Sequence, residues 1–383
     1  MRLIHTSDWH LGRLFHNIHL TDDQAHVLDQ FVALVRDEKP DAVLIAGDIY
    51  DRAFPPASAV ELLDDVLHRL AGDLRVPTFV IAGNHDSPER LGFGARLLGQ
   101  RGLHVAGTLT QGLAPVTLSD HHGDVDVFLV PYASPEVVRA WCGSDDVVDH
   151  PSAMQRLLQS VRGRCTPGRR SIVVAHAFVQ GGEESESERA LEVGGAGAVP
   201  SELFESLHYV ALGHLHGPQL VRSERLRYPG SLLKYSFSET EHEKSVALVE
   251  MDAQGAVRVR PRPLSPRRDV RVIEGTMQQV LDGAATDSCR DDYIKVRLLD
   301  AGPVLDAMAK LREVYPNVLH LERPHLGAST DARREAVDPR RLGTLELFEA
   351  FFDQVSGQRL DDRQREEVIA AIAWAERRRE AAE

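Results

Sequence analysis

The chain has 383 residues, enough for two or three domains of about 150 residues, which excludes an isolated small module. Its 44 Lys and Arg residues are outnumbered by 58 Asp and Glu residues, giving a net charge of -14. This balance excludes binding of nucleic acid or acidic membranes through a positive charge spread over the whole chain. Any phosphate must therefore be bound by a local group of residues.

The composition is otherwise that of a folded globular protein, with 43% hydrophobic and 27% charged residues. Cys142, Cys165 and Cys289 are far apart and form no Cys-x-x-Cys motif, so we expect no disulfide framework and a reducing, cytoplasmic environment. Asp8 interrupts the N-terminal segment before a signal-peptide core could form, and no apolar run approaches the ~18 residues of a membrane span. We therefore expect neither secretion nor membrane insertion.

The first two-thirds of the chain alternates between strand-like and helix-like segments. Short apolar runs typical of strands lie at residues 3–4, 42–46, 78–82, 125–130, 172–175 and 209–212. Amphipathic stretches at residues 23–37 and 57–70 separate the first of them, which predicts an α/β sheet. Alternating residues at 245–251 and 256–260 predict a hairpin that completes the sheet. We predict one domain over residues 1–266.

A second, smaller domain is predicted at residues 267–330, where a β-α-β pattern occupies residues 293–299, 303–314 and 318–321. The charged, proline-containing residues 331–343 are predicted to be a linker. Residues 344–383 carry two helical patterns, at 345–355 and 361–379. The apolar stripe of the first has little core of its own, which favours docking on a partner: Leu345, Phe348, Phe351, Phe352 and Val355.

Side chains of the kinds that commonly bind metal ions follow directly after five of the apolar runs. They are Asp8 and His10, Asp48, Asn84 and His85, His176, and His214 and His216. Because the carboxyl ends of strands in an open α/β sheet border one crevice, these residues can converge. Residues i and i+2 of an extended segment project to one side, so each of the Asp8–His10 and His214–His216 pairs can present two ligands. Each pair alone is a weak signal, but their combination predicts one metal site.

Seven of these side chains are candidate ligands, more than a tetrahedral ion uses, whereas two ions that share a carboxylate would each have about four. Imidazole, carboxylate and amide ligands without sulfur suit manganese, iron or zinc, and the oxygen share favours Mn2+. Two such ions would clamp a phosphoryl group, which predicts phosphoester hydrolysis. His85 points away from Asn84 and is a candidate general acid or donor, and Asp86 is a candidate partner that holds a neighbouring histidine.

The order Asp-x-His, Gly-Asp, Gly-Asn-His-Asp, His and Gly-His-x-His resembles the calcineurin-like metallophosphoesterases over residues 1–260. Residues 6–13 (TSDWHLGR), 181–189, 213–219 and 228–231 resemble the bacterial SbcD family of nuclease subunits, which act with the SbcC ATPase. The resemblance implies a β-sandwich flanked by helices, an α+β capping domain that shapes a DNA groove, and C-terminal helices that bind SbcC. It also implies a homodimer formed by helices at residues 57–70 and 88–98.

The resemblance further implies a distribution of roles. One metal would be bound by Asp8, His10, Asp48 and His216, and the other by Asp48, Asn84, His176 and His214. His85 would be the catalytic histidine. The implied activity is cleavage of DNA phosphodiesters, as an exonuclease on duplex ends and an endonuclease on single strands or hairpins, in break and hairpin processing. The chain has no Gly-x-x-x-x-Gly-Lys-Ser/Thr loop, so ATP is expected to be bound by the partner.

Several positions leave two interpretations open. After Asp48 the chain reads Ile49-Tyr50-Asp51-Arg52, where archaeal relatives carry a histidine that orients substrate. Arg13, His16 and Arg52 are candidates for phosphate contacts or are solvated loop residues. The arginines between residues 258 and 271 could face DNA or solvent. The acidic residues 183–192 are expected to be solvated, and only the resemblance suggests a role for them in an interface or in gating. The alternative functions are a stand-alone phosphoesterase of small phosphodiesters or phosphoproteins, and a scaffold that has lost ligands.

Overall fold

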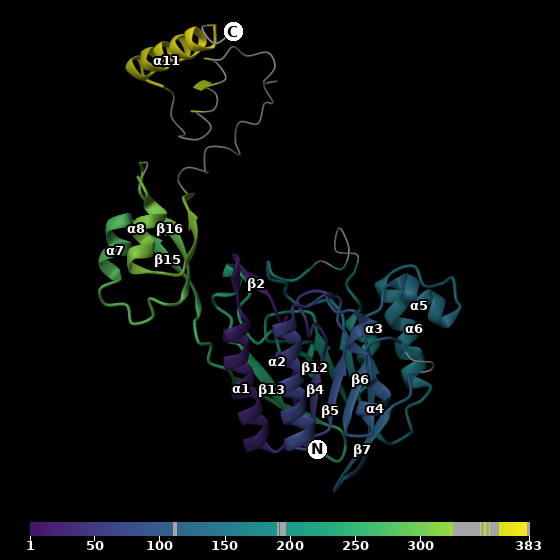
Figure 1. Cartoon of the computed structure of the whole chain (residues 1–383). Coiled ribbons are helices and arrows are strands. Elements are labelled where there is room, and N and C mark those ends of the chain that lie inside the picture. Colours follow the sequence, from purple (N-terminus) through teal and green to yellow (C-terminus); the bar gives the residue numbers. More distant parts are fainter. Residues whose placement is uncertain are drawn as a thin grey trace. The chain divides into compact units, whose positions relative to one another are not determined.

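The computed structural model describes residues 1–109, 113–189, 191, 197–302, 304–324, 345, 348–349, 352 and 360–380. The chain divides into two compact units, Met1–Val270 and Arg271–Glu383 (Figure 1). Within the described residues, no helix is long and apolar enough to cross a membrane. Cys142, Cys165 and Cys289 are free thiols, which confirms the expectation that they form no disulfide.

Two six-stranded sheets run through the described part of the first unit. The first has the order β14-β13-β1-β4-β5-β6. Its strands are β1 (Arg2–Thr6), β4 (Ala42–Ile45), β5 (Thr78–Ile81), β6 (Leu103–Ala106), β13 (Ser245–Met251) and β14 (Val257–Pro263). Strands β1, β4, β5 and β6 are parallel, and β13 pairs antiparallel with both β1 and β14. The predicted hairpin is therefore confirmed, and it adds the last two strands of this sheet.

The second sheet has the order β11-β12-β10-β9-β8-β7. Its strands are β7 (Val116–Asp120), β8 (Gly123–Val130), β9 (Arg170–His176), β10 (Tyr209–Gly213), β11 (Gln219–Val221) and β12 (Ser223–Tyr228). The central four strands are parallel, and the two outer strands are antiparallel to their neighbours. All six strands predicted from apolar runs are present in one sheet or the other.

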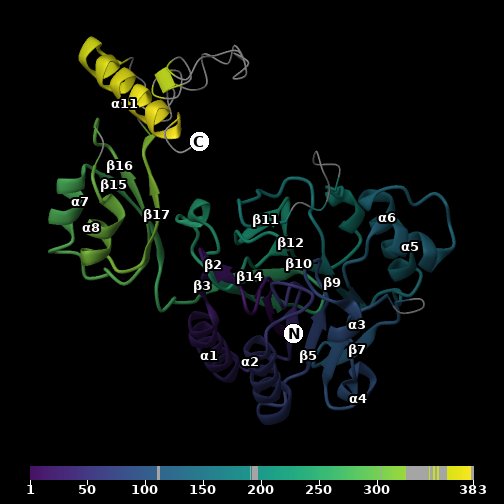
Figure 2. The same cartoon turned by 45° about the horizontal axis from the view of Figure 1, so that its top comes forward.

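The two sheets pack face to face, and alternation along each strand decides which side chains meet. Leu3, Leu44 and Phe79 of the first sheet form one buried cluster with Ile172 and Tyr209 of the second. The intervening residues of the first sheet point outward, where α1 (Thr21–Glu38) and α2 (Ala57–Leu67) lie over them (Figure 2). The outer face of the second sheet packs with α5 (Pro135–Cys142) and α6 (His150–Arg162). The predicted α/β sandwich flanked by helices is confirmed.

Short elements connect these layers. They are β2 (Leu14–Phe15), β3 (Ile18–His19), the π-helical turn η1 (His68–Asp73), α3 (Pro88–Leu91), α4 (Ala95–Gly99), and the 3-10 turns η2 (Ser201–Phe204) and η3 (Phe237–Glu239). The helix predicted at residues 57–70 is therefore regular only to Leu67, and the one at residues 88–98 is split.

The second unit contains a three-stranded sheet with the order β15-β16-β17. Its elements are β15 (Val270–Gly275), α7 (Met277–Gly283), β16 (Tyr293–Leu298), α8 (Ala307–Val314) and β17 (Val318–Glu322). The predicted β-α-β pattern is confirmed, whereas β15 and α7 were not predicted. The signal for α7 was present, because Thr276 and Gln279 form a reciprocal capping box.

The C-terminal helix α11 (Asp362–Glu380) agrees with the helix predicted at residues 361–379. Asp361 caps it, accepting a hydrogen bond from the Gln364 amide at 2.7 Å while Gln364 Oε1 accepts one from the Asp361 amide. The predicted linker at 331–343 lies outside the described residues. Of the predicted helix at 345–355, only Leu345, Phe348, Glu349 and Phe352 are described, and they are helical.

A buried ion pair fastens the second sheet of the first unit. Arg170 donates to both carboxylate oxygens of Asp120, and each of the two side chains is 4% exposed. The hydrogen bonds from Arg170 hold the pKa of Asp120 well below its usual range. Removing one partner of such a pair leaves an uncompensated buried charge.

We expect Asp120→Asn to lower the free energy of unfolding by about 3 kcal/mol at pH 7. The pKa of Asp120 is depressed in the folded chain, so its contribution is complete above the unfolded value of about 3.9 and is lost progressively as the pH falls from there through the lower folded pKa. The stabilities of wild type and variant, measured by urea titration, should therefore begin to converge below about pH 4 and approach each other further as the pH is lowered. The exposed Asp145→Asn is the control. Equal stabilities of Asp120→Asn and wild type at pH 7 would contradict this account.

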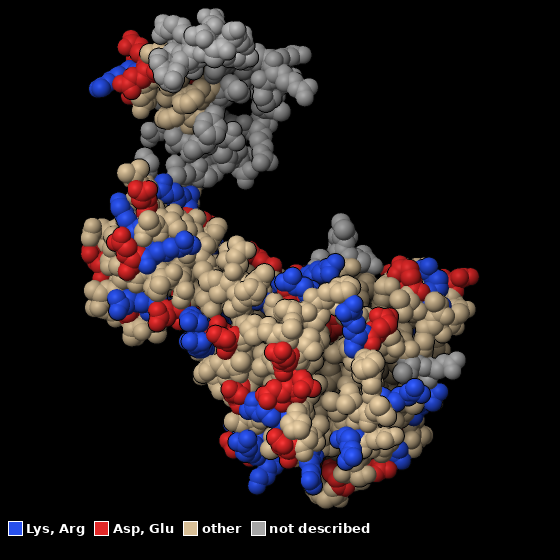
Figure 3. Space-filling view, in the orientation of Figure 1, with Lys and Arg blue, Asp and Glu red and all other residues tan. Residues whose placement is uncertain are grey.

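Five of the six arginines between residues 258 and 271 are paired with acidic side chains. Arg260 contacts Glu250, Arg262 contacts Glu38, and Arg267 and Arg268 contact Asp22 and Asp23. In the second unit Arg271 contacts Asp287 and Asp292. On the face of the first unit seen in Figure 3, basic and acidic side chains are interspersed. This favours a solvated surface over a DNA-facing basic stripe.

Candidate metal centre

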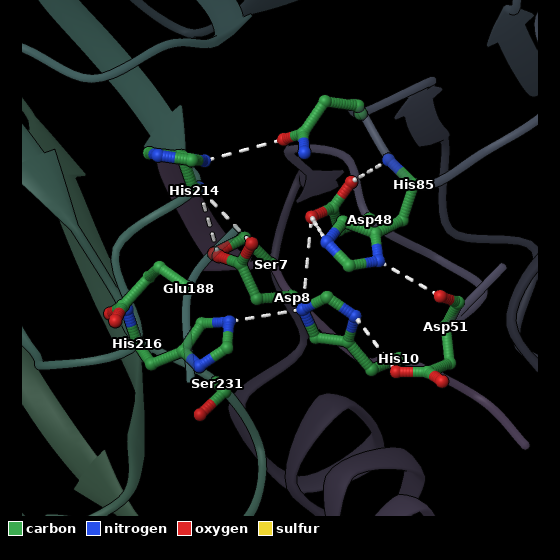
Figure 4. A network of polar contacts seen from close by, with 12 residues as sticks. Ser7, Asp8, His10, Asp48, Asp51, His85, Glu188, His214, His216 and Ser231 are labelled. Carbon is green, nitrogen blue, oxygen red and sulfur yellow. Dashed lines mark hydrogen bonds and ion pairs between the residues drawn. The ribbon is translucent and has the colours of Figure 1, made fainter. Parts of the chain in front are cut away.

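The predicted ligands come together where β1, β4, β5, β9 and β10 end (Figure 4). The loops after β1 and β4 are joined by hydrogen bonds from the Asp8 amide to the Gly47 carbonyl and from the His10 amide to the Asp48 carbonyl, both 3.0 Å. The His214 amide donates to the Asp8 carboxylate at 3.1 Å, which joins the second sheet to the first. Loops more than two hundred residues apart in sequence therefore form one pocket.

The backbone at these loops is not extended, contrary to the i, i+2 argument made from sequence. Asp8, His10 and Asp48 have φ angles of 53°, 46° and 48°, in the left-handed region. Each such residue costs roughly 1–2 kcal/mol. The convergence was predicted correctly, but left-handed turns that redirect the side chains produce it, and not the alternation of a strand.

Close approach of the β4 and β5 loops requires a residue without a side chain. A Cβ added at Gly83 would lie 2.1 Å from Asp48 Oδ1 and 2.3 Å from the Asp48 amide nitrogen. Both are far inside van der Waals contact, so Gly83 lets the loop that carries Asn84 and His85 reach Asp48.

One group of ligand atoms is formed by Asp8, His10 and His216, whose ligand atoms lie within 4.8 Å of one another. The Nε2 atoms of His10 and His216 are 3.0 Å apart, and His10 Nε2 is 3.7 Å from Asp48 Oδ2. These are the four residues that the resemblance assigns to one metal.

A second group is formed by Asp8, Asp48 and His176, again within 4.8 Å. His176 Nε2 is 3.6 Å from Asp48 Oδ2 and 2.9 Å from Asn84 Oδ1, and His214 Nδ1 is 3.3 Å from the same amide oxygen. The structure thus brings all seven predicted ligands together. Asp8 belongs to both groups, and Asp48 belongs to the second group and approaches His10 of the first.

The chemistry of this pocket fits divalent cations. His10 Nδ1 and His214 Nε2 are buried without a hydrogen-bond partner among the described residues. Burial, followed by neighbouring histidines, lowers the pKa values of His10 and His214 well below the usual value, so both rings are neutral and can donate a lone pair. Burial and the charge of Asp48 raise the pKa of Asp8. A buried pair of carboxylates among neutral imidazoles lacks the positive charge that a metal supplies.

The ring of His85 lies beside both groups, and its ligand atom also lies within 4.8 Å of those of His10 and Asp51. Its Nδ1 is 2.8 Å from the Asp51 carbonyl oxygen, which can only accept, so Nδ1 carries the proton and Nε2 faces the pocket. His85 Nε2 is 3.9 Å from Asp48 Oδ2, and the His85 amide donates to Asp48 Oδ1 at 2.9 Å. The side chain of His85 is 13% exposed, so it is accessible from outside the pocket.

The prediction that Asp86 holds a neighbouring histidine is wrong. Its carboxylate accepts hydrogen bonds from the amides of Ile49, Tyr50 and Gly83. Asp86 is buried, and this burial, together with the charge of Asp48, raises its pKa to about 7. Three backbone donors satisfy it, so Asp86 fastens the β4 loop to the β5 loop and acts on the site through the backbone.

The three predicted phosphate-contact residues lie in different surroundings. Arg13 donates to Asp51 Oδ1 at 3.1 Å and to the Ser187 carbonyl at 3.2 Å, and its guanidinium lies over the Tyr235 ring. His16 is exposed at the turn between β2 and β3, with its ring against Phe15 and Phe237. Arg52 is exposed on the loop after Asp51.

The acidic run at residues 183–192 is not merely solvated, as the sequence suggested. Glu188 Oε1 accepts a hydrogen bond from the His216 amide at 2.7 Å, and Ser187 Oγ is 2.5 Å from His216 Nδ1. The other carboxylate oxygen of Glu188 accepts from the amide and hydroxyl of Ser185. The run therefore includes a loop, Ser185–Glu188, that fastens a predicted metal ligand.

Further supporting residues were not found from sequence. The buried Gln24 of α1 donates to the carbonyls of Trp9 and His10 and accepts from the Gly12 amide, which fixes the loop after β1. The hydroxyl of Tyr235 donates to the Trp9 carbonyl. Glu239 and Lys244, both buried, form an ion pair below His216. These partners are far apart in sequence, so no local motif indicated them.

The sandwich and the paired ligand groups at its strand ends define a calcineurin-like phosphoesterase. A family model described as calcineurin-like phosphoesterase matches residues 1–218, and one described as type 5 capsule protein repressor C-terminal domain matches residues 266–356. The SbcD subunit of nuclease SbcCD from Staphylococcus saprophyticus subsp. saprophyticus is 33% identical over 368 residues, which cover 96% of both chains. The chain belongs to the SbcD family of calcineurin-like phosphoesterases.

Solved structures with weaker similarity include TT1561 of Thermus thermophilus, which is 15% identical with a TM-score of 0.39. The match covers 68% of this chain and 98% of that one. A dimetal phosphatase from Danio rerio is 13% identical with a TM-score of 0.37, and the match covers 69% of this chain and 96% of that one.

Proposed function

We propose that this chain is the nuclease subunit of an SbcCD-type complex and hydrolyses DNA phosphodiesters in break and hairpin processing. It acts as an exonuclease on duplex ends and an endonuclease on single strands and hairpins. The observation that carries the proposal is the convergence of two ligand groups on Asp48, with His85 beside them. The similarity to a nuclease subunit over almost the whole chain supports DNA as the substrate.

The residues Asp8, His10, Asp48 and His216 would hold one divalent ion, and Asp48, Asn84, His176 and His214 the other, with Mn2+ the favoured metal. When bound, such ions activate a water molecule and neutralise charge that develops on the phosphate. The protein would contribute a rigid ligand set. His176 Nδ1 donates to the Ala46 carbonyl at 2.9 Å, which leaves its Nε2 lone pair directed at Asp48 and Asn84.

His85 is the proposed catalytic residue. The Asp51 carbonyl fixes its Nδ1 proton, so Nε2 is the atom available to accept or return a proton at the scissile phosphate. Arg13, His16 and Arg52 are proposed to contact substrate phosphates. Arg13 is already oriented by Asp51 and Tyr235, which lowers the entropy that its side chain would lose on binding.

A stand-alone phosphoesterase of small phosphodiesters or phosphoproteins is the alternative. The second unit and the family model over residues 266–356 favour the nuclease, because a small-molecule enzyme requires neither. The test is incubation of the purified chain with end-labelled duplex, hairpin and single-stranded DNA, with Mn2+ or Mg2+, with and without SbcC. Cleavage of small phosphodiesters but of none of these DNAs would establish the alternative.

The proposed domain roles follow the sequence boundaries. Residues 1–266 form the nuclease domain, 267–330 the capping domain of the DNA groove, 331–343 a linker, and 344–383 the helices that bind an SbcC-type ATPase. The last assignment is supported by a groove of about 480 Å³ beside α11. Its apolar lining comes from both helical segments: Phe348, Phe352, Leu360, Val368, Ala371 and Ile372.

Truncation at residue 340 is expected to abolish association with SbcC and any ATP-stimulated duplex cleavage, because it removes this apolar groove. Metal binding and single-strand cleavage should remain, since no predicted ligand lies beyond His216. Size-exclusion chromatography of the truncated chain with SbcC measures the association. Co-elution with undiminished affinity would show that the docking surface lies elsewhere.

A homodimer is proposed to form through α2 and the α3–α4 segment. Large apolar side chains are exposed on and beside these helices, with Phe54 70% and Phe93 85% exposed, together with Val60 and Leu97. Arg90 lies over the Phe54 ring at 4.1 Å, which places a cation on this surface.

The proposed location of the complex is the cytoplasm, at the nucleoid.

A further inference from the structure

Four histidines of the site have a hydrogen-bonded Nδ1, and their partners differ in kind; the partner of His214 Nδ1 is the side-chain oxygen of Asn84, 3.3 Å away. His176 and His85 contact the backbone carbonyls of Ala46 and Asp51, at 2.9 Å and 2.8 Å. A carbonyl oxygen can only accept, so it fixes the proton on Nδ1 by itself. His216 Nδ1 instead meets the hydroxyl of Ser187 at 2.5 Å. A hydroxyl can donate or accept, so this contact alone leaves the tautomer of His216 open.

Glu239 removes that freedom. The Ser187 hydroxyl donates its single hydrogen to Glu239 Oε1 at 2.5 Å. Once that hydrogen is used, the Ser187 oxygen can only accept from His216 Nδ1. The lone pair of His216 then lies on Nε2, the atom that is 3.0 Å from His10 Nε2 in the first ligand group.

Lys244 keeps Glu239 in this role. Its Nζ donates to Glu239 Oε2 at 2.5 Å, to the His216 carbonyl at 2.7 Å and to Ser231 Oγ at 2.9 Å. Glu239 is 0% exposed and Lys244 is 5% exposed, so no solvent competes for the carboxylate. The same ammonium group therefore binds both the carboxylate that orients Ser187 and the backbone of His216.

We propose that Ser187, Glu239 and Lys244 are positioning residues that force His216 into the Nδ1-protonated tautomer and so prepare its Nε2 for a metal ion. The inference rests on the proposed function, in which His216 is a ligand. It gives a function to two segments that lie outside the ligand motifs: the Ser185–Glu188 loop, and η3 with the residues that follow it up to Lys244. Removing one such supporting hydrogen bond typically costs about 10- to 100-fold in metal affinity.

The test compares Ser187→Ala with wild type in the full-length chain. Titration with Mn2+ alone, followed by electron paramagnetic resonance, should show one of two equivalents weakened about 10- to 100-fold and the other unchanged. Glu239→Gln should give a loss of the same kind, because an amide can donate to the Ser187 oxygen and frees its hydrogen to turn toward His216. Ser58→Ala, which removes an exposed hydroxyl on α2, is the control.

A second readout separates tautomer control from loss of folding. Nitrogen NMR of histidine-labelled, metal-free chain should show His216 protonated at Nδ1 in wild type and a mixture of tautomers in Ser187→Ala. An Nε2-protonated His216 in wild type would overturn the proposal, as would wild-type affinity for both Mn2+ equivalents in Ser187→Ala. If wild type binds two Mn2+ but cleaves no DNA, the proposed function fails and the positioning role stands.

Discussion

Replacing Asp48 by alanine is expected to remove nearly all activity and to lower occupancy of both metal sites. Asp48 Oδ2 lies 3.7 Å from His10 Nε2 and 3.6 Å from His176 Nε2, so it lies between the histidines of both groups. Asp8 also belongs to both groups, but by itself it supplies only one of the two negative charges. Without a shared carboxylate, the repulsion between two adjacent cations is uncompensated. The loss of cleavage should exceed the roughly 100-fold typical of a residue outside the ligand set.

Elemental analysis of bound metal and single-turnover cleavage measure the two effects separately. Asp48→Asn is a useful second variant, because it keeps an oxygen for the His85 amide while it removes the negative charge. The exposed Asp64→Ala on α2 is the control for a lost carboxylate. Retention of two metal equivalents in Asp48→Ala would show that Asp48 does not bridge.

Replacing His85 by alanine or glutamine is expected to leave both metals bound and to slow hydrolysis about 10²- to 10⁴-fold, the range for a positioned acid or base. The expectation follows from geometry, because His85 Nδ1 is occupied by the Asp51 carbonyl while Nε2 faces the pocket. Metal titration and single-turnover rates at saturating DNA should therefore respond differently.

His122→Ala, at the exposed turn between β7 and β8, is the matched control and should cleave at the wild-type rate. A His85 variant that cleaves near the wild-type rate would exclude a catalytic role. Loss of one metal equivalent in the His85 variants would instead identify His85 as a ligand.

The sequence predicted what depends on local pattern and on the general geometry of sheets. Apolar runs located the strands, and the rule that ligands gather at carboxyl strand ends correctly placed Asp48 and His176 in one pocket. The i, i+2 argument correctly predicted that Asp8 and His10 lie in one pocket, but it assumed an extended backbone. Both residues have a left-handed φ, which the alternation of side chains in a sequence does not indicate.

What the sequence could not predict depends on contacts between distant segments. Glu188 approaches His216 across 28 residues, and Lys244 approaches the same histidine from the other side across another 28. Nothing in an acidic run distinguishes a carboxylate that accepts a buried amide from one that faces water. The prediction for Asp86 was wrong for the same reason, because its donors are backbone amides that carry no sequence signature.

The pairing of surface arginines has a consequence for how DNA would be retained by the complex. A protein that neutralises phosphates releases condensed counterions, and each contact steepens the fall of affinity with salt. Arg260, Arg262 and Arg268 already have carboxylate neighbours, so bringing them to a phosphate would exchange one anion for another. We therefore expect these arginines to add little to the salt dependence of DNA binding. Other surfaces of the complex would then supply most of the contacts to the phosphates of duplex DNA.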